Sequence, residues 1–100
     1  MSSEISKERL EKYFQITSEA LAAAQKARVT GKISLDGKEK TLEVLDMVER
    51  YVSDAKFFAS RGDVVLAFAA LNYAHGWLDA GARLGLFSVK DSRLFTVDDD

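Results

Sequence analysis

The sequence predicts an all-α fold, a three-helix antiparallel up-and-down bundle that spans residues 1–100 as one domain and has an ordered C-terminal tail. Three observations lead to this prediction. The chain has no proline, apolar residues recur at helical spacing in three long segments, and glycines fall between those segments. Hydrophobic residues make up 47% of the 100 residues, which suits a single globular domain with one modest core.

The first helix is expected over residues 3–28, with Ser3 or Ser6 as its N-cap. When residues are placed at about 100° per position, the apolar ones share one face. That face comprises Leu10, Tyr13, Phe14, Thr17, Ala20, Leu21, Ala24 and Ala27. A connecting loop is expected between this helix and the next.

The second helix is expected over residues 38–61, preceded by Asp36, which has capping-box spacing with Glu39. Its apolar face comprises Val44, Leu45, Met47, Val48, Tyr51, Val52, Ala55, Phe58 and Ala59. Gly62 is expected to end this helix and Asp63 to cap the next one. Such a short link predicts two antiparallel neighbours.

The third helix is expected over residues 64–87, with Gly85 as the alternative end, and is apolar around most of its circumference. Large residues form one flank, on which we expect Tyr73 and Trp77 to be core aromatics with a hydrogen-bonding edge. Gly76 and Gly81 predict close backbone contact or a local break, because glycine costs up to about 1 kcal/mol in a helix interior. The tail should pack back on the bundle or on a partner through Val89, Leu94, Phe95 and Val97.

One polar stripe interrupts the third helix. Asn72, His75, Asp79 and Arg83 follow one another at spacings of three, four and four, which places them on one helical face. The His75–Asp79 pair could orient an imidazole for general base chemistry, and Arg83 could grip a carboxylate or phosphate. The alternatives are a solvated helix face with an ordinary ion pair, or a buried polar network at an interface.

Further residues outside the stripe could support it or the core. Asp54, on the edge of the apolar face of the second helix, could hydrogen-bond Tyr73 or Trp77, cap a loop, or join the stripe as an acid. Tyr73 and Trp77 could also stack on a ligand ring, although a core role is the simpler interpretation. Phe57 projects off its helix face, as an isolated exposed aromatic or as an interface anchor.

Composition disfavours several classes of function. There is no cysteine and one histidine, so neither a metal site nor a cofactor is expected. No run approaches the ~20 apolar residues that a membrane span needs, and no signal peptide is recognisable, so a cytoplasmic location is expected. The net charge of −2 disfavours a nucleic-acid binder, although a basic cluster surrounds the first loop. Its members are Lys26, Arg28, Lys32, Lys38 and Lys40.

Residues 50–58, Arg61-Gly62-Asp63 and the string Gly76-Trp77-Leu78-Asp79-Ala80-Gly81 after an alanine-rich segment together resemble a known family. The chain is similar to the small archaeal proteins grouped as domain of unknown function 357. The resemblance covers residues 40–87 well and the first helix more loosely. It implies a three-helix up-and-down bundle in an archaeal cytoplasmic protein, and it implies no activity. The matching positions include Asp54, Asp63, Tyr73, Trp77, Asp79 and Arg83.

The sequence favours a non-enzymatic interaction module that self-associates or binds a protein partner. Its third helix is apolar on more sides than two neighbouring helices can cover. The alternative is a small anionic-ligand or catalytic site on the Asn72-His75-Asp79-Arg83 stripe. A third possibility is a weak nucleic-acid accessory that uses the basic cluster of the first loop.

Overall fold

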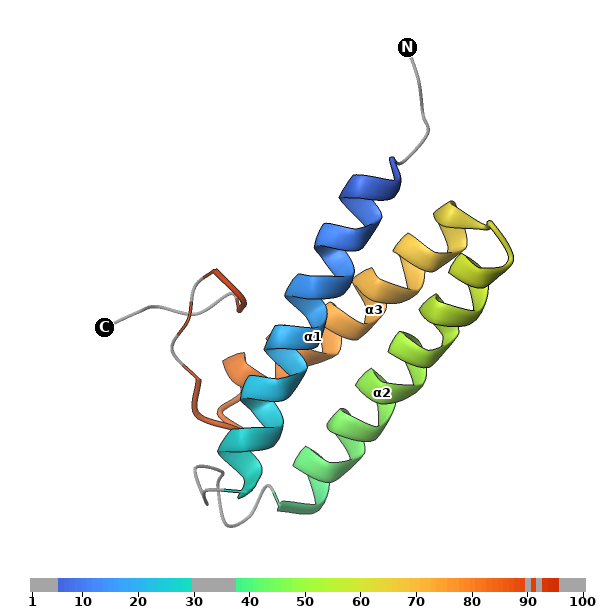
Figure 1. Cartoon of the computed structure of the whole chain (residues 1–100). Helices are drawn as coiled ribbons and strands as arrows, with labels where there is room; N and C mark the ends of the chain where they lie inside the picture. The colour runs from blue at the N-terminus through green and yellow to red at the C-terminus, as the bar shows by residue number, and fades with distance from the viewer. Residues whose placement is uncertain (1–5, 30–37, 90, 92, 96–100) are drawn as a thin grey trace.

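The computed structural model describes residues 6–29, 38–89, 91 and 93–95 of the chain. Within them lie three helices, α1 (Lys7–Val29), α2 (Lys38–Ser60) and α3 (Val64–Arg83). The helices α2 and α3 are antiparallel neighbours joined by a tight turn, and α3 packs on both α2 and α1 (Figure 1). The predicted all-α three-helix bundle is therefore confirmed.

The first helix begins directly after Ser6, whose hydroxyl oxygen accepts a hydrogen bond from the Arg9 backbone N–H at 3.1 Å. Ser6 is therefore the N-cap, because its side chain satisfies one of the free donors of the first turn. Every position of the predicted apolar face of α1 is buried or half-buried. The connecting loop and the capping residue Asp36 lie outside the described residues.

The turn between α2 and α3 has the predicted chemistry. Gly62 adopts a φ of 77°, and the N–H groups of Gly62 and Asp63 donate to the carbonyls of Ala59 and Phe58 at 3.0 and 2.9 Å. This is a Schellman ending, in which glycine avoids the steric cost of a left-handed conformation. The Asp63 carboxylate then accepts from the Leu66 N–H at 3.1 Å, which caps α3. Both predictions for this turn are confirmed.

The third helix ends at Arg83, which corrects the predicted end at residue 87. A second Schellman ending is the physical reason. Gly85 has a φ of 75°, its N–H donates to the Ala82 carbonyl at 3.1 Å, and the Leu86 N–H donates to the Gly81 carbonyl at 2.9 Å. The chain therefore reverses at Gly85 and returns toward the side of α3.

The returning chain completes the core. Phe87, Leu94 and Phe95 are buried in one cluster with residues of all three helices, including Ala24 of α1 and Leu78 of α3. The buried Thr41 hydroxyl of α2 donates to the Leu86 carbonyl at 3.0 Å. The predicted packing of the tail is confirmed for Val89, Leu94 and Phe95, whereas Val97 lies outside the described residues.

The orientation of α3 differs from the prediction. Its small residues Ala67, Ala70, Ala74 and Gly81 form a buried strip, while Tyr73 and Trp77 are 64% and 37% exposed. The core role expected for these two aromatics is therefore wrong. The strip faces inward because it lets α2 and Phe87 approach the α3 backbone closely, which turns the large flank outward.

The two interior glycines of α3 also behave differently from each other. A Cβ on Gly81 would lie 2.6 Å from Cε1 of Phe87, so the predicted close contact is confirmed there. A Cβ on Gly76 would meet no atom within 4 Å, and the helix continues unbroken through this residue. The prediction of close packing or a break at Gly76 is therefore wrong, because Gly76 opens onto the surface.

Candidate functional site

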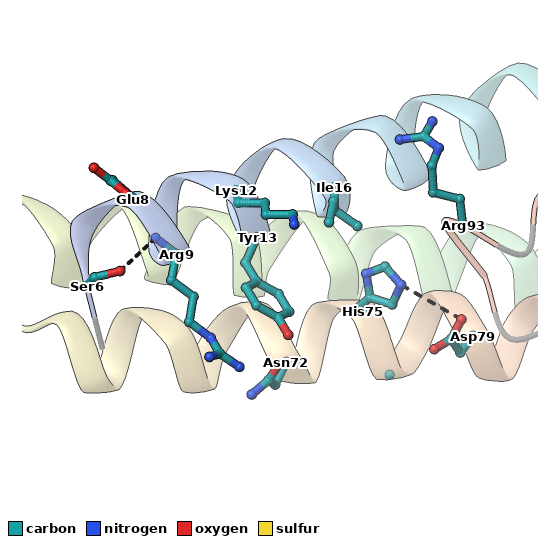
Figure 2. A pocket seen from close by; sticks show the side chains of 11 residues that line it. Ser6, Glu8, Arg9, Lys12, Tyr13, Ile16, Asn72, His75, Asp79 and Arg93 are labelled. Carbon is teal, nitrogen blue, oxygen red and sulfur yellow. Dashed lines mark hydrogen bonds and ion pairs between the residues drawn. The ribbon is translucent and has the colours of Figure 1, made fainter. Parts of the chain in front are cut away.

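A groove of about 830 Å³ runs between α1 and α3 and is closed at one end by the tail. We call it the α1/α3 groove. Helical spacing of three and four residues brings its lining side chains onto one face of each helix (Figure 2). The lining residues are Ser6, Glu8, Arg9, Lys12, Tyr13, Ile16, Asn72, His75, Gly76, Asp79 and Arg93.

The structure brings three of the four predicted stripe residues into this groove. Asn72, His75 and Asp79 line it, with Asn72 exposed and the other two half-buried. Arg83, the last residue of α3, is exposed and does not line it. Arg93 of the tail lines the groove in place of Arg83, and its guanidinium is directed toward α1 (Figure 2).

His75 fastens the tail to α3. Its Nε2 lies 2.6 Å from the Leu94 carbonyl oxygen, so the ring donates its Nε2 hydrogen to that acceptor. The nearest Asp79 carboxylate oxygen is 3.9 Å from the same nitrogen, beyond hydrogen-bond distance. This geometry commits the Nε2 proton to the Leu94 carbonyl oxygen.

The charges of the groove are unevenly paired. Arg93 lies 2.9 Å from a Glu19 carboxylate oxygen and 3.7 Å from one of Asp91. Among the described residues, Arg9 and Lys12 make no ion pair, although both line the groove. The Arg9 guanidinium is instead 5.9 Å from the centre of the Tyr13 ring, which is within cation–π range.

A second, shallower depression of about 610 Å³ lies on the outward side of α3. Its lining residues are Ala69, Asn72, Tyr73, Gly76, Trp77 and Ala80. The Tyr73 ring is supported by Tyr51 of α2, which stacks on it with 5.3 Å between ring centres and 16° between planes. Because Asn72 and Gly76 line both hollows, the two surfaces adjoin along α3.

The remaining predicted site residues are dispersed over the surface. Asp54 is exposed on α2 and, among the described residues, makes no hydrogen bond to Tyr73 or Trp77. Phe57 is also exposed on α2, with the Arg61 guanidinium 5.0 Å from its ring centre. Of the basic cluster, Lys26, Arg28 and Lys40 are exposed, while Lys32 lies outside the described residues, as does the side chain of Lys38.

Sequence reasoning missed the cations of the α1/α3 groove. On the first helix considered alone, Lys12 falls opposite the apolar face, and nothing in the sequence of that helix marks Arg9 or Lys12 as part of a site. The available signal was spacing, because Arg9, Lys12, Tyr13 and Ile16 form one helical face.

Within the described part of the chain, no group of three His, Asp or Glu side chains is placed to hold a metal ion.

One family model covers most of the bundle. Residues 12–87 match the family model described as "Protein of unknown function (DUF357)". The chain belongs to this family. The DUF357 segment includes the whole of α2 and α3 and the Gly85 reversal, whereas Arg9 and Arg93 of the α1/α3 groove lie outside it.

No curated protein and no solved structure matches this DUF357 chain. None of the described helices is both long enough and apolar enough to cross a membrane. Any function must therefore be argued from the two surfaces of α3 described above.

Proposed function

We propose that this DUF357 domain is a helix-pairing module that self-associates through the outward face of α3. The observation that supports this proposal is a row of residues along that face, which we call the outer seam. The seam runs at alternating spacings of three and four, a pattern that pairs helices in coiled coils and bundles. Its members are Leu66, Ala69, Tyr73, Gly76, Ala80 and Arg83.

The inner side of α3 has the same spacing. Ala67, Leu71, Ala74, Leu78 and Gly81 follow one another at intervals of four and three, and all are buried against the rest of the bundle. The helix therefore presents two packing faces, and the described residues cover only the inner one. On the outer side Leu66 is 46% and Leu84 76% exposed, which is apolar surface suited to an interface.

The outer seam is shaped to fit a copy of itself. Gly76 leaves an open hollow at the middle of the seam, and the rings of Tyr73 and Trp77 stand beside it. A two-fold axis near Gly76 would place an aromatic ring of each copy over the hollow of the other. Interfaces of this isologous kind need a protrusion and a recess on one patch, and rigid aromatic side chains are common anchors in them.

Light scattering on the purified protein tests the proposal. A dimer is expected at micromolar concentration, with twice the monomer mass of 11.1 kDa. Trp77→Glu should restore the monomer because it places a charge in the centre of the interface. Phe57→Glu is the matched control, since Phe57 is exposed on α2 outside the seam, and it should remain dimeric.

Circular dichroism should show unchanged helix content in both variants. A monomer at every concentration would overturn self-association and leave the outer seam available for a helix of another protein. A Trp77→Glu variant that still dimerises would place the interface elsewhere on the molecule.

A further inference from the structure

We infer that the α1/α3 groove binds a small molecule that has a phosphate or carboxylate at one end and hydrogen-bond donors at the other. This inference rests on other residues than the self-association proposed above, because the groove opens between α1 and α3 and its cations lie outside the outer seam, with which it shares Gly76. Its volume of about 830 Å³ is typical of pockets that hold small ligands.

Arg9 and Lys12 would bind the anionic end of the ligand. They lie one turn apart on α1, both line the groove, and neither forms an ion pair with a described residue. Other arginines of this acidic protein do find carboxylates, as Arg50 does with Asp46 at 3.0 Å. Two neighbouring unpaired cations in one groove favour an anionic oxygen cluster over any other ligand group.

The Arg9 side chain is held in place before a ligand arrives. Its guanidinium lies 5.9 Å from the Tyr13 ring centre and 6.0 Å from that of Phe68, and these two rings contact each other edge to face at 4.5 Å. A guanidinium positioned by two rings loses less side-chain freedom when it binds. Figure 2 shows it reaching from α1 toward α3, and the amide of Asn72, which lines the same groove, can add a neutral donor.

The opposite end of the groove has different chemistry. Asp79 brings a carboxylate there, and the His75 ring is fixed by its 2.6 Å hydrogen bond to the Leu94 carbonyl. A second anionic group would be repelled by Asp79, whereas hydroxyl or amino groups could donate to carboxylate oxygens. Gly76 leaves the space between the two ends open, because a Cβ there would meet nothing within 4 Å.

Amide NMR titrations with three probes test the inference. Inorganic phosphate and malonate separate the two anion chemistries, and glycerol 3-phosphate adds hydroxyl groups to the phosphate. Each is compared with sodium chloride at equal ionic strength. We expect saturable shifts at the Asn72 side-chain amide and the Gly76 backbone amide, with glycerol 3-phosphate binding more tightly than phosphate.

The variants Lys12→Gln and Arg9→Gln should each weaken binding by about tenfold, since each removes a charge-assisted hydrogen bond. Lys56→Gln is the control, because Lys56 is equally exposed but lies on α2 and does not line the groove. Amide dispersion in the free variants checks the fold, and Lys12→Gln leaves the Ser6 cap of α1 unaltered. The inference is overturned if no probe causes saturable shifts, or if the two groove variants bind as well as Lys56→Gln.

Discussion

The ring of Phe87 lies directly against the backbone of Gly81. A Cβ placed on Gly81 would be 2.6 Å from Cε1 and 2.7 Å from Cζ of that ring. The Gly85 reversal brings Phe87 to this position, and Phe87 is buried there with Leu94 and Phe95. A single helix position therefore determines how closely the tail can pack on α3.

The glycines of α3 should respond in opposite ways to one substitution. Gly81→Ala should destabilise the protein by about 1–3 kcal/mol, because the buried Phe87 ring must shift to accommodate the methyl group. Gly76→Ala should stabilise the monomer by about 0.5–1 kcal/mol, since within one chain the methyl group meets open space and alanine favours the helix. Urea unfolding of both variants checks the difference. A loss of stability in Gly76→Ala would show that this position has a packing role.

Two buried threonines, Thr41 and Thr17, should also respond differently to the same substitution. The Thr41 hydroxyl donates to the Leu86 carbonyl at 3.0 Å, whereas the Thr17 hydroxyl has no hydrogen-bond partner among the described residues. Thr41→Val should cost about 1–3 kcal/mol because it leaves that carbonyl without its donor. Thr17→Val should be neutral or slightly stabilising, because an unsatisfied buried hydroxyl is replaced by a methyl group. Thermal unfolding measures both, and equal losses would contradict the assigned hydrogen bonding.

The parts of the fold that depend on local chemistry could be predicted from the sequence. Apolar spacing located the helices, and the Gly62-Asp63 pair gave the turn because its hydrogen bonds join residues within one stretch of chain. Gly85 carries the same local signal and was one of the two ends predicted for α3, but the apolar residues beyond it favoured the longer helix. The hydropathy of these residues thus favoured the wrong end of the helix. They are apolar because the tail packs into the core, not because the helix continues.

The parts that depend on tertiary contacts could not be predicted in the same way. Hydropathy does not distinguish the two faces of α3, because both are apolar, so Tyr73 and Trp77 were expected inside. The candidate site has the same limit. Asn72, His75 and Asp79 share a face by helical spacing alone, but Arg93 joins them only through the path of the tail.

The Asp63 cap should make a measurable contribution to stability. Its carboxylate accepts from the Leu66 N–H at 3.1 Å in the first turn of α3, where a negative charge also interacts favourably with the helix dipole. Asp63→Ala should therefore cost about 1 kcal/mol in the free energy of unfolding. Asp54→Ala removes an exposed carboxylate from the interior of α2 and should have little effect. Denaturant unfolding gives the free energy of unfolding of both variants. Similar losses in Asp63→Ala and Asp54→Ala would mean that the cap contributes nothing to stability.

The hydrogen bond from His75 to Leu94 should control local opening of the tail. The backbone N–H groups of Leu94 and Phe95 donate to the Asp91 carbonyl at 3.0 and 2.8 Å, so their exchange with solvent reports when this turn opens. His75→Ala removes the anchor on the Leu94 carbonyl, and the loss of one such bond is worth about 0.5–1.5 kcal/mol. The exchange of these two amides should accelerate, while amides in the middle of α2 keep their protection.

Asn72→Ala is the matched control for this prediction. Asn72 lies one turn earlier on the same face of α3 and lines the same groove, but it is exposed and has no hydrogen bond to the tail among the described residues. Its substitution should leave exchange in the tail unchanged. If His75→Ala instead accelerates exchange throughout α2 and α3, the ring supports the whole bundle, because only global unfolding exposes all those amides together. Burial of Leu94 and Phe95 should keep the tail attached in the variant, so its exchange should remain slower than that of an unfolded chain.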